Sequence, residues 1–186
     1  MVAIAGVAVW LAVDMRRRPE RRVRAIFTAL FAVYLVLVVQ ATMFPIPIDG
    51  SSPANATRFN LMPFRNFLDG PPINREQAIP NVFLGVPFGF LAFFVIRRPS
   101  PWRVLTYGVG LFLAVECLQL LLLQVVPAAP RTADINDVIL NVVGVVIGIV
   151  LFLAFAAIVR HRDGAGDLGD SDLHGFLREV TAADPA

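Results

Sequence analysis

Four long apolar segments determine what this chain can fold into. They cover residues 25–44, 81–96, 104–126 and 136–159, and prolines or arginines follow each of them. A helix needs about 20 mainly apolar residues to cross the hydrocarbon core of a bilayer. The chain is 57% hydrophobic and only 16% charged, whereas soluble domains carry about 25% charged residues. The sequence therefore predicts an all-α, polytopic membrane helix bundle.

A shorter apolar segment at residues 1–14 is expected to add an N-terminal helix, which gives about five transmembrane helices in all. Arginines cluster at residues 16–24, 97–103 and 160–162. Basic residues concentrate in cytoplasmic loops, and five spans with the N-terminus outside place all three clusters inside. If residues 1–14 do not span, the other four helices keep the same orientation. We therefore expect a multi-pass cell-membrane protein with a cytoplasmic C-terminus.

The same pattern divides the chain into three parts. Residues 1–24 form the N-terminal helix with its Arg-rich cytoplasmic loop, residues 25–159 the transmembrane domain, and residues 160–186 a cytoplasmic acidic tail. The tail is rich in Gly, Asp and Ala, a composition that favours disorder. The alternative is a short helix over residues 172–180.

One face of the last span is polar where the span begins. Asp134, Asp137 and Asn141 share one stripe of a helix, because successive residues turn by about 100°. One Asp could simply cap this helix, since Asp suits the positive end of the helix dipole. Gly144 and Gly148 continue the stripe and are expected to pack closely against another helix.

Glu116 lies near the middle of a predicted span, where an ionised carboxylate is costly unless it is paired or hydrated. It is either an internal residue, hydrogen-bonded to Asn141 or Gln119, or a functional one. The predicted topology brings the polar residues to the outer leaflet, where residues 58–67 would roof an outward-facing cavity. The candidate ligand-binding residues are Asn60, Arg65, Asn81, Gln119, Arg131, Asp137 and Asn141.

Two arginines of this set suit an anionic group. Arg65 and Arg131 could hold phosphate or carboxylate through the planar fork of the guanidinium group. The alternative is structural: ion pairs of Arg131 with Asp134, or of Arg65 with Asp137.

The motifs of several enzyme classes are absent from the sequence. There is no Gly-rich phosphate loop, zincin motif or Gly-x-Ser-x-Gly, and both histidines lie on the predicted cytoplasmic side. Any catalysis would therefore fall to Glu116, Asp134 and Asp137, and a divalent ion held through their oxygens is one form it could take. No cofactor and no dedicated metal site are otherwise expected. The basic residues mark topology, so no nucleic-acid partner is expected.

Four ordered blocks resemble the VanZ-like family of bacterial membrane proteins. They are Asn60-Leu-Met-Pro-Phe-Arg65, Asn81–Phe90, Glu116-Cys-Leu-Gln119 and Arg131–Gly144, and the resemblance covers about residues 30–155. It implies a four-helix core and a cell-envelope setting. The founding member of that family accompanies glycopeptide resistance genes and gives low-level teicoplanin resistance, so the resemblance also implies an antibiotic-resistance context.

The family pattern transfers to individual positions of this chain. A departure is Gly85, where relatives often carry a bulky apolar residue. The matching positions are Asn60, Pro63, Arg65, Asn81, Pro87, Gly89, Glu116, Gln119, Arg131, Asp134, Asp137, Asn141 and Gly144.

Three functional hypotheses remain open. In the first, the outer polar cavity binds a lipid-linked cell-wall precursor or a lipoglycopeptide. In the second, the protein is a membrane-embedded hydrolase or transferase that uses Glu116, Asp134 and Asp137 on a lipid or envelope substrate. In the third, it is a structural partner of another membrane protein and docks through its glycine faces.

Overall fold

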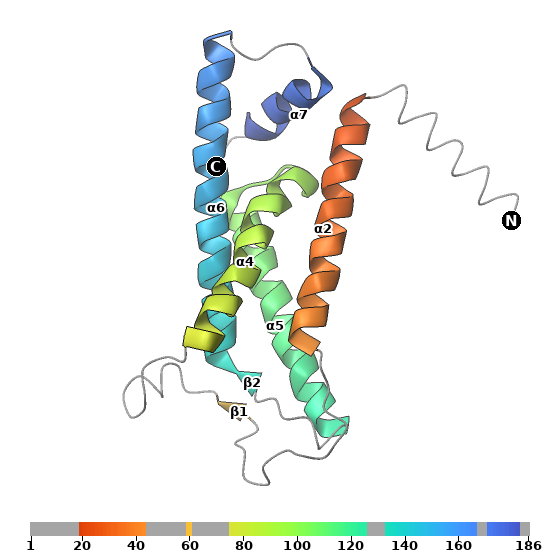
Figure 1. Cartoon of the computed structure of the whole chain (residues 1–186), viewed down its shortest axis with the longest axis vertical. Coiled ribbons are helices and arrows are strands. Elements are labelled where there is room, and N and C mark those ends of the chain that lie inside the picture. Colours follow the sequence, from red (N-terminus) through yellow and green to blue (C-terminus); the bar gives the residue numbers. More distant parts are fainter. Residues whose placement is uncertain (1–18, 44–58, 61–74, 126–132, 167–170, 183–186) are drawn as a thin grey trace, which may run out of the picture.

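The computed structural model describes residues 19–43, 59–60, 75–125, 133–166 and 171–182. Helices dominate this part of the chain, and its only strands are two of two residues each (Figure 1). The predicted N-terminal helix at residues 1–14 lies outside the described residues. The elements, in order, are α2 (Pro19–Met43), β1 (Phe59–Asn60), α4 (Arg75–Val95), α5 (Pro101–Val125), β2 (Ala133–Asp134), α6 (Ile135–Gly164) and α7 (Asp172–Thr181).

Four of these helices, α2, α4, α5 and α6, are long and apolar enough to cross a membrane. The prediction of an all-α, polytopic membrane bundle is therefore confirmed, and the chain is a multi-pass membrane protein. Several boundaries differ from expectation. Helix α2 begins at Pro19 rather than at residue 25, and α5 begins at Pro101 rather than at residue 104. Helix α4 begins at Arg75 rather than at residue 81, so it includes Pro80 as well as Pro87, and α6 continues past residue 159 to Gly164.

Helices α4 and α6 form the closest contact in the bundle. Gly85 and Gly89 of α4 meet Gly144 and Gly148 of α6, and their backbones touch. A methyl group on Gly85 would collide with the backbone of Asn141, and glycines allow such an approach because they have no side chain. The predicted role of these glycines in packing is confirmed.

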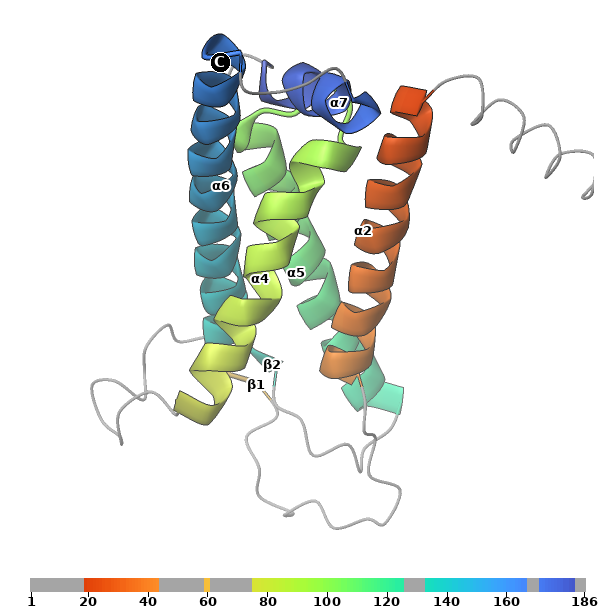
Figure 2. The ribbon, with the colours of Figure 1, turned by 45° about the horizontal axis from the view of Figure 1, so that its top comes forward.

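The other helices surround this pair. Figure 2 shows α4 between α2 and α6, with α5 behind it. The Tyr34 hydroxyl of α2 donates to the Leu84 carbonyl of α4 over 2.5 Å. Away from the glycines, phenylalanines fill the core: the Phe93 and Phe152 rings stack with centroids 3.8 Å apart, and those of Phe27 and Phe94 stack at 4.3 Å.

Within the tail, the structure has the short helix that was considered as the alternative to disorder: Asp172–Thr181 form α7. This helix lies across the ends of α2 and α6 (Figures 1 and 2). The Ser171 side chain caps its N-terminus, and the Phe176 side chain is completely buried. Apolar packing therefore holds a polar segment against the bundle, which tail composition alone does not reveal.

Candidate functional site

The two short strands join the start of α6 to a distant segment. They pair in parallel, with Phe59 opposite Ala133 and Asn60 opposite Asp134. Asp134 is also the N-cap of α6, because its carboxylate accepts a hydrogen bond from the Asn136 backbone N–H over 2.9 Å. The capping role considered for one of the two acids thus belongs to Asp134. A cap of this kind contributes about 1 kcal/mol to helix stability.

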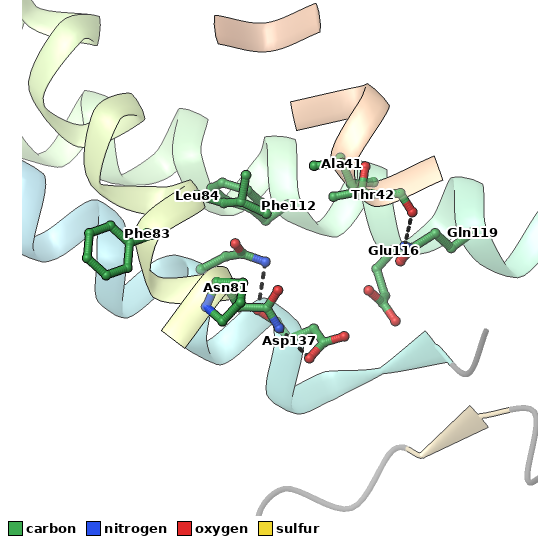
Figure 3. A pocket seen from close by; sticks show the side chains of 12 residues that line it. Ala41, Thr42, Asn81, Phe83, Leu84, Phe112, Glu116, Gln119 and Asp137 are labelled. Atoms are coloured by element: carbon green, nitrogen blue, oxygen red, sulfur yellow. Dashed lines mark hydrogen bonds between the residues drawn. The ribbon is translucent and has the colours of Figure 1, made fainter. Parts of the chain in front are cut away.

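A cavity of about 390 Å³ lies near this end of the bundle, between α2, α4, α5 and α6 (Figure 3). The structure brings five of the predicted site residues together in its walls and adds one that was not predicted, Thr42. Arg65 and Arg131 lie outside the described residues, and Asn60 is described by its backbone alone. The polar lining residues are Thr42, Asn81, Glu116, Gln119, Asp137 and Asn141.

Hydrogen bonds across the cavity tie the helices together. The Asn81 side-chain amide of α4 donates to the Asp137 carboxylate of α6 over 2.5 Å. The Gln119 amide of α5 donates to the Thr42 backbone carbonyl of α2 over 2.9 Å. These contacts give Asn81, Gln119 and Asp137 a structural role at the cavity wall (Figure 3).

Two buried hydrogen-bond acceptors in the cavity wall lack donors among the described residues. Glu116 Oε1 and Asn141 Oδ1 are both inaccessible, and neither has a hydrogen-bond partner among the described residues. The two expected partners of Glu116 are engaged elsewhere: Gln119 bonds Thr42, and the Asn141 amide donates to the Asp137 backbone carbonyl over 2.8 Å.

The described walls of the cavity are rich in acceptors and acids. Glu116 and Asp137 line it, and no described lining residue is basic. Acceptors without partners bind hydroxyl, amide or ammonium donors, because a donor replaces the water that each acceptor has lost. Among the described residues, no three His, Cys, Asp or Glu side chains are arranged to hold a metal ion, so Glu116, Asp134 and Asp137 do not form the divalent-ion site considered from the sequence.

Thr42 lines the cavity but was not predicted as part of the site. Its hydroxyl is turned back to the Val38 carbonyl over 2.7 Å, and its own carbonyl accepts from Gln119. No side-chain signal identified this contact, because the interhelical hydrogen bond uses the backbone carbonyl, which any residue type at position 42 would offer. His161 and His174 lie in the last turn of α6 and in α7, at the other end of the bundle, as expected.

Comparison with known protein families gives a match. The family model described as VanZ/LLP1 matches residues 31–157. The matched segment includes both strands, all of α4 and α5, and the parts of α2 and α6 that line the cavity, and it ends before α7. No curated protein and no solved structure shows a significant match.

Proposed function

The chain belongs to the VanZ/LLP1 family, and on that premise we propose that it binds an amphiphilic molecule of the cell envelope in the cavity between α2, α4, α5 and α6. The observation that carries the proposal is the pair of buried acceptors, Glu116 Oε1 and Asn141 Oδ1, in the wall of a cavity within an apolar bundle. Each buried acceptor without a partner costs about 1–3 kcal/mol. A ligand that supplies donors offsets this cost and gains affinity from it.

The chemistry of the walls favours one class of ligand. The acceptors suit the hydroxyl, amide and amino groups of a sugar or peptide headgroup, and the apolar lining residues Phe83, Leu84 and Phe112 suit a lipid chain. A volume of about 390 Å³ falls in the usual range for small-molecule sites, about 300–1,000 Å³, and is sufficient for part of such a molecule. Lipid-linked cell-wall precursors and lipoglycopeptides such as teicoplanin both combine these two parts.

An anionic group of the same ligand would bind Arg65 and Arg131. The pairing of Asn60 with Asp134 supports this assignment, because it joins the two chain segments that carry these arginines. We propose that the cavity faces the outside of the cell membrane, as the distribution of arginine predicts. The ligand would then enter from the outer leaflet.

The first experiment is antibiotic susceptibility in a sensitive bacterial host. Teicoplanin and vancomycin would be compared for wild type, Glu116→Gln and Asp137→Asn at matched membrane levels. Asp172→Asn is the control, because it removes an exposed acid in α7, far from the cavity. We expect protection against teicoplanin from wild type and the control, and loss in the two cavity variants.

Binding measurements on the purified variants distinguish a loss of ligand affinity from a loss of the folded structure. Asp137→Asn also disturbs the bond from Asn81, so the melting temperature of each purified variant is needed. Glu116→Gln should keep the fold and weaken teicoplanin binding about tenfold, since a hydrogen bond to a charged group contributes about 1.5–3 kcal/mol. Equal affinity for teicoplanin in wild type and Glu116→Gln would remove the cavity from the proposal.

A second candidate function is catalysis by carboxylates. It is favoured by the proximity of Glu116 to Asp137, which line the same cavity, and by the suitability of a buried acid for proton transfer. Asp134 contributes less, because its carboxylate caps α6. Hydrolysis or transfer measured over a panel of envelope lipids, and its loss in Glu116→Gln, would support this function over simple binding.

The third hypothesis, docking to another membrane protein, loses its original basis. Gly85, Gly89, Gly144 and Gly148 are buried against one another inside the bundle. Their faces are therefore not free for a partner. A partner subunit would have to bind elsewhere, and co-purification in a stoichiometric ratio would be needed to support it.

A further inference from the structure

A second cavity, of about 560 Å³, lies at the opposite end of the bundle, beside α7. Its walls come from the start of α2, the end of α4, the connection from α4 to α5, and α7. Figures 1 and 2 show α7 lying over this end of the molecule. The cavity shares no lining residue with the site described above.

Positive charge predominates in its described walls. Three arginines line it, Arg24, Arg97 and Arg98, against one acid, Glu179. Glu179 is already engaged, because it accepts a hydrogen bond from Arg24 over 2.7 Å. The Arg24 guanidinium also stands over the Phe176 ring, 5.5 Å from its centroid. Arg24 is thus held in place by two contacts, and an anion in the cavity would meet a preformed positive wall.

Arg97 and Arg98 differ from Arg24. Both are exposed, and within the described part of the chain neither forms an ion pair. Two neighbouring arginines at the edge of a cavity repel one another. An anion between them would remove that repulsion and accept several charge-assisted hydrogen bonds.

The backbone at Arg98 is unusual. Its φ angle is 58°, in the left-handed region that residues with a side chain rarely adopt. The Arg98 carbonyl accepts a hydrogen bond from the Arg103 guanidinium over 2.7 Å, which holds this conformation. Glycine would adopt it without strain, so the presence of arginine points to a use for its guanidinium group.

The position of the cavity relative to the membrane identifies the anion. One candidate span ends at Val95 and the next begins at Pro101, so the arginines lie at the edge of the hydrocarbon core, where lipid phosphates are found. Phe93, Ile96 and Val180 give the same cavity an apolar wall. We propose that this cavity binds the phosphate of an anionic phospholipid through Arg97 and Arg98, with the guanidinium group of Arg24, which is held in place by Glu179, as a third hydrogen-bond donor.

The test is lipid binding by the full-length protein in detergent after removal of bound lipid. Native mass spectrometry would measure the affinities for dioleoylphosphatidylglycerol and dioleoylphosphatidylcholine. The variant is Arg97→Gln with Arg98→Gly, which removes both guanidinium groups and leaves the connection unstrained. The control is Arg162→Gln, since Arg162 is an exposed arginine near the same end that does not line the cavity.

We expect wild type and Arg162→Gln to bind phosphatidylglycerol alike, and the double variant to bind it about tenfold more weakly. Phosphatidylcholine should bind weakly to all three. A competition arm with inorganic phosphate distinguishes the sources. Failure of millimolar phosphate to displace the lipid supports a lipid headgroup, whereas displacement assigns the site to soluble phosphates and overturns the lipid assignment. Equal binding of phosphatidylglycerol by wild type and the double variant, with a melting temperature of the variant no lower than that of wild type, would overturn the site itself.

Discussion

Single glycines determine how closely two spans approach. An alanine at Gly85 would place its methyl group against the backbone of Asn141 and 2.7 Å from the Val145 backbone nitrogen. Backbone atoms of a packed helix cannot turn away as a side chain can, so α4 and α6 must separate. We predict that Gly85→Ala lowers the free energy of unfolding by about 3 kcal/mol, the upper end of the usual cost of overpacking. Thermal unfolding of the purified protein in detergent measures this.

Gly110 supplies the matched control. Nothing lies within 4 Å of a methyl group built at this position, and Gly110 lies within helix α5. Alanine is a better helix former than glycine by about 0.5–1 kcal/mol. Gly110→Ala should therefore leave the melting temperature unchanged or raise it, and a comparable loss in both variants would mean that helix contact is not the cause.

For Arg98 we predict that substitution by glycine increases stability. A residue with a side chain in the left-handed conformation is destabilised by about 1–2 kcal/mol, and Arg98 has a φ of 58°. Arg98→Gly should raise the unfolding free energy by about 1 kcal/mol, since the carbonyl that Arg103 contacts remains. Arg97→Gly is the control, because Arg97 has no positive φ. A gain at position 97 but not at 98 would contradict the assigned strain.

Helix α7 depends on one aromatic side chain. Phe176 is fully buried, and its ring stacks on Phe27 with centroids 5.7 Å apart. Replacing a buried Phe by Ala costs about 3–5 kcal/mol, which is large for a helix of 10 residues. We predict that Phe176→Ala releases α7 while the four spans stay folded, with faster hydrogen exchange confined to residues 172–181.

Leu173 lies in the same helix but is 46% exposed. Leu173→Ala should keep the hydrogen-exchange protection of α7. Two ion pairs, Arg24 with Glu179 and Arg178 with Asp163, also join α7 to the bundle, but exposed pairs contribute little. If Leu173→Ala released α7 as readily as Phe176→Ala, the packing of Phe176 would not be what holds the helix.

For the molecule as a whole, the proposed orientation is directly testable. In a Cys117→Ser background, Ser51→Cys should react with a membrane-impermeant maleimide in intact cells. Ala165→Cys, at the exposed end of α6, should react only after permeabilisation. The arginine clusters supply the physical reason, because basic residues near the ends of spans stay in the cytoplasm. The reverse labelling pattern would place the polar cavity on the cytoplasmic side and remove the proposed route from the outer leaflet.

The candidate site was partly visible in the sequence. The spacing of Asp137 and Asn141 predicted a shared face, and the cavity contains both of them. Glu116 was conspicuous as an acid within an apolar span. Its surroundings could not be predicted, because the same spacing is compatible with a Glu116 that bonds Gln119 and with a Gln119 that bonds Thr42. The register between α5 and α2 selected the second arrangement.

The sequence alone determined the number of spans, the prolines and arginines that follow them, and the family. The reason is that the length of an apolar segment and the order of motifs can be read directly along the chain. Tertiary structure alone decided that Asp134 caps α6 rather than lining the cavity, that Glu116 Oε1 and Asn141 Oδ1 lack partners among the described residues, and that Phe176 docks the acidic tail. Each of these outcomes depends on which helices meet and in what register. The position of a short polar segment such as α7 is determined by apolar contacts with other helices. Its local sequence therefore carries almost no signal for that position.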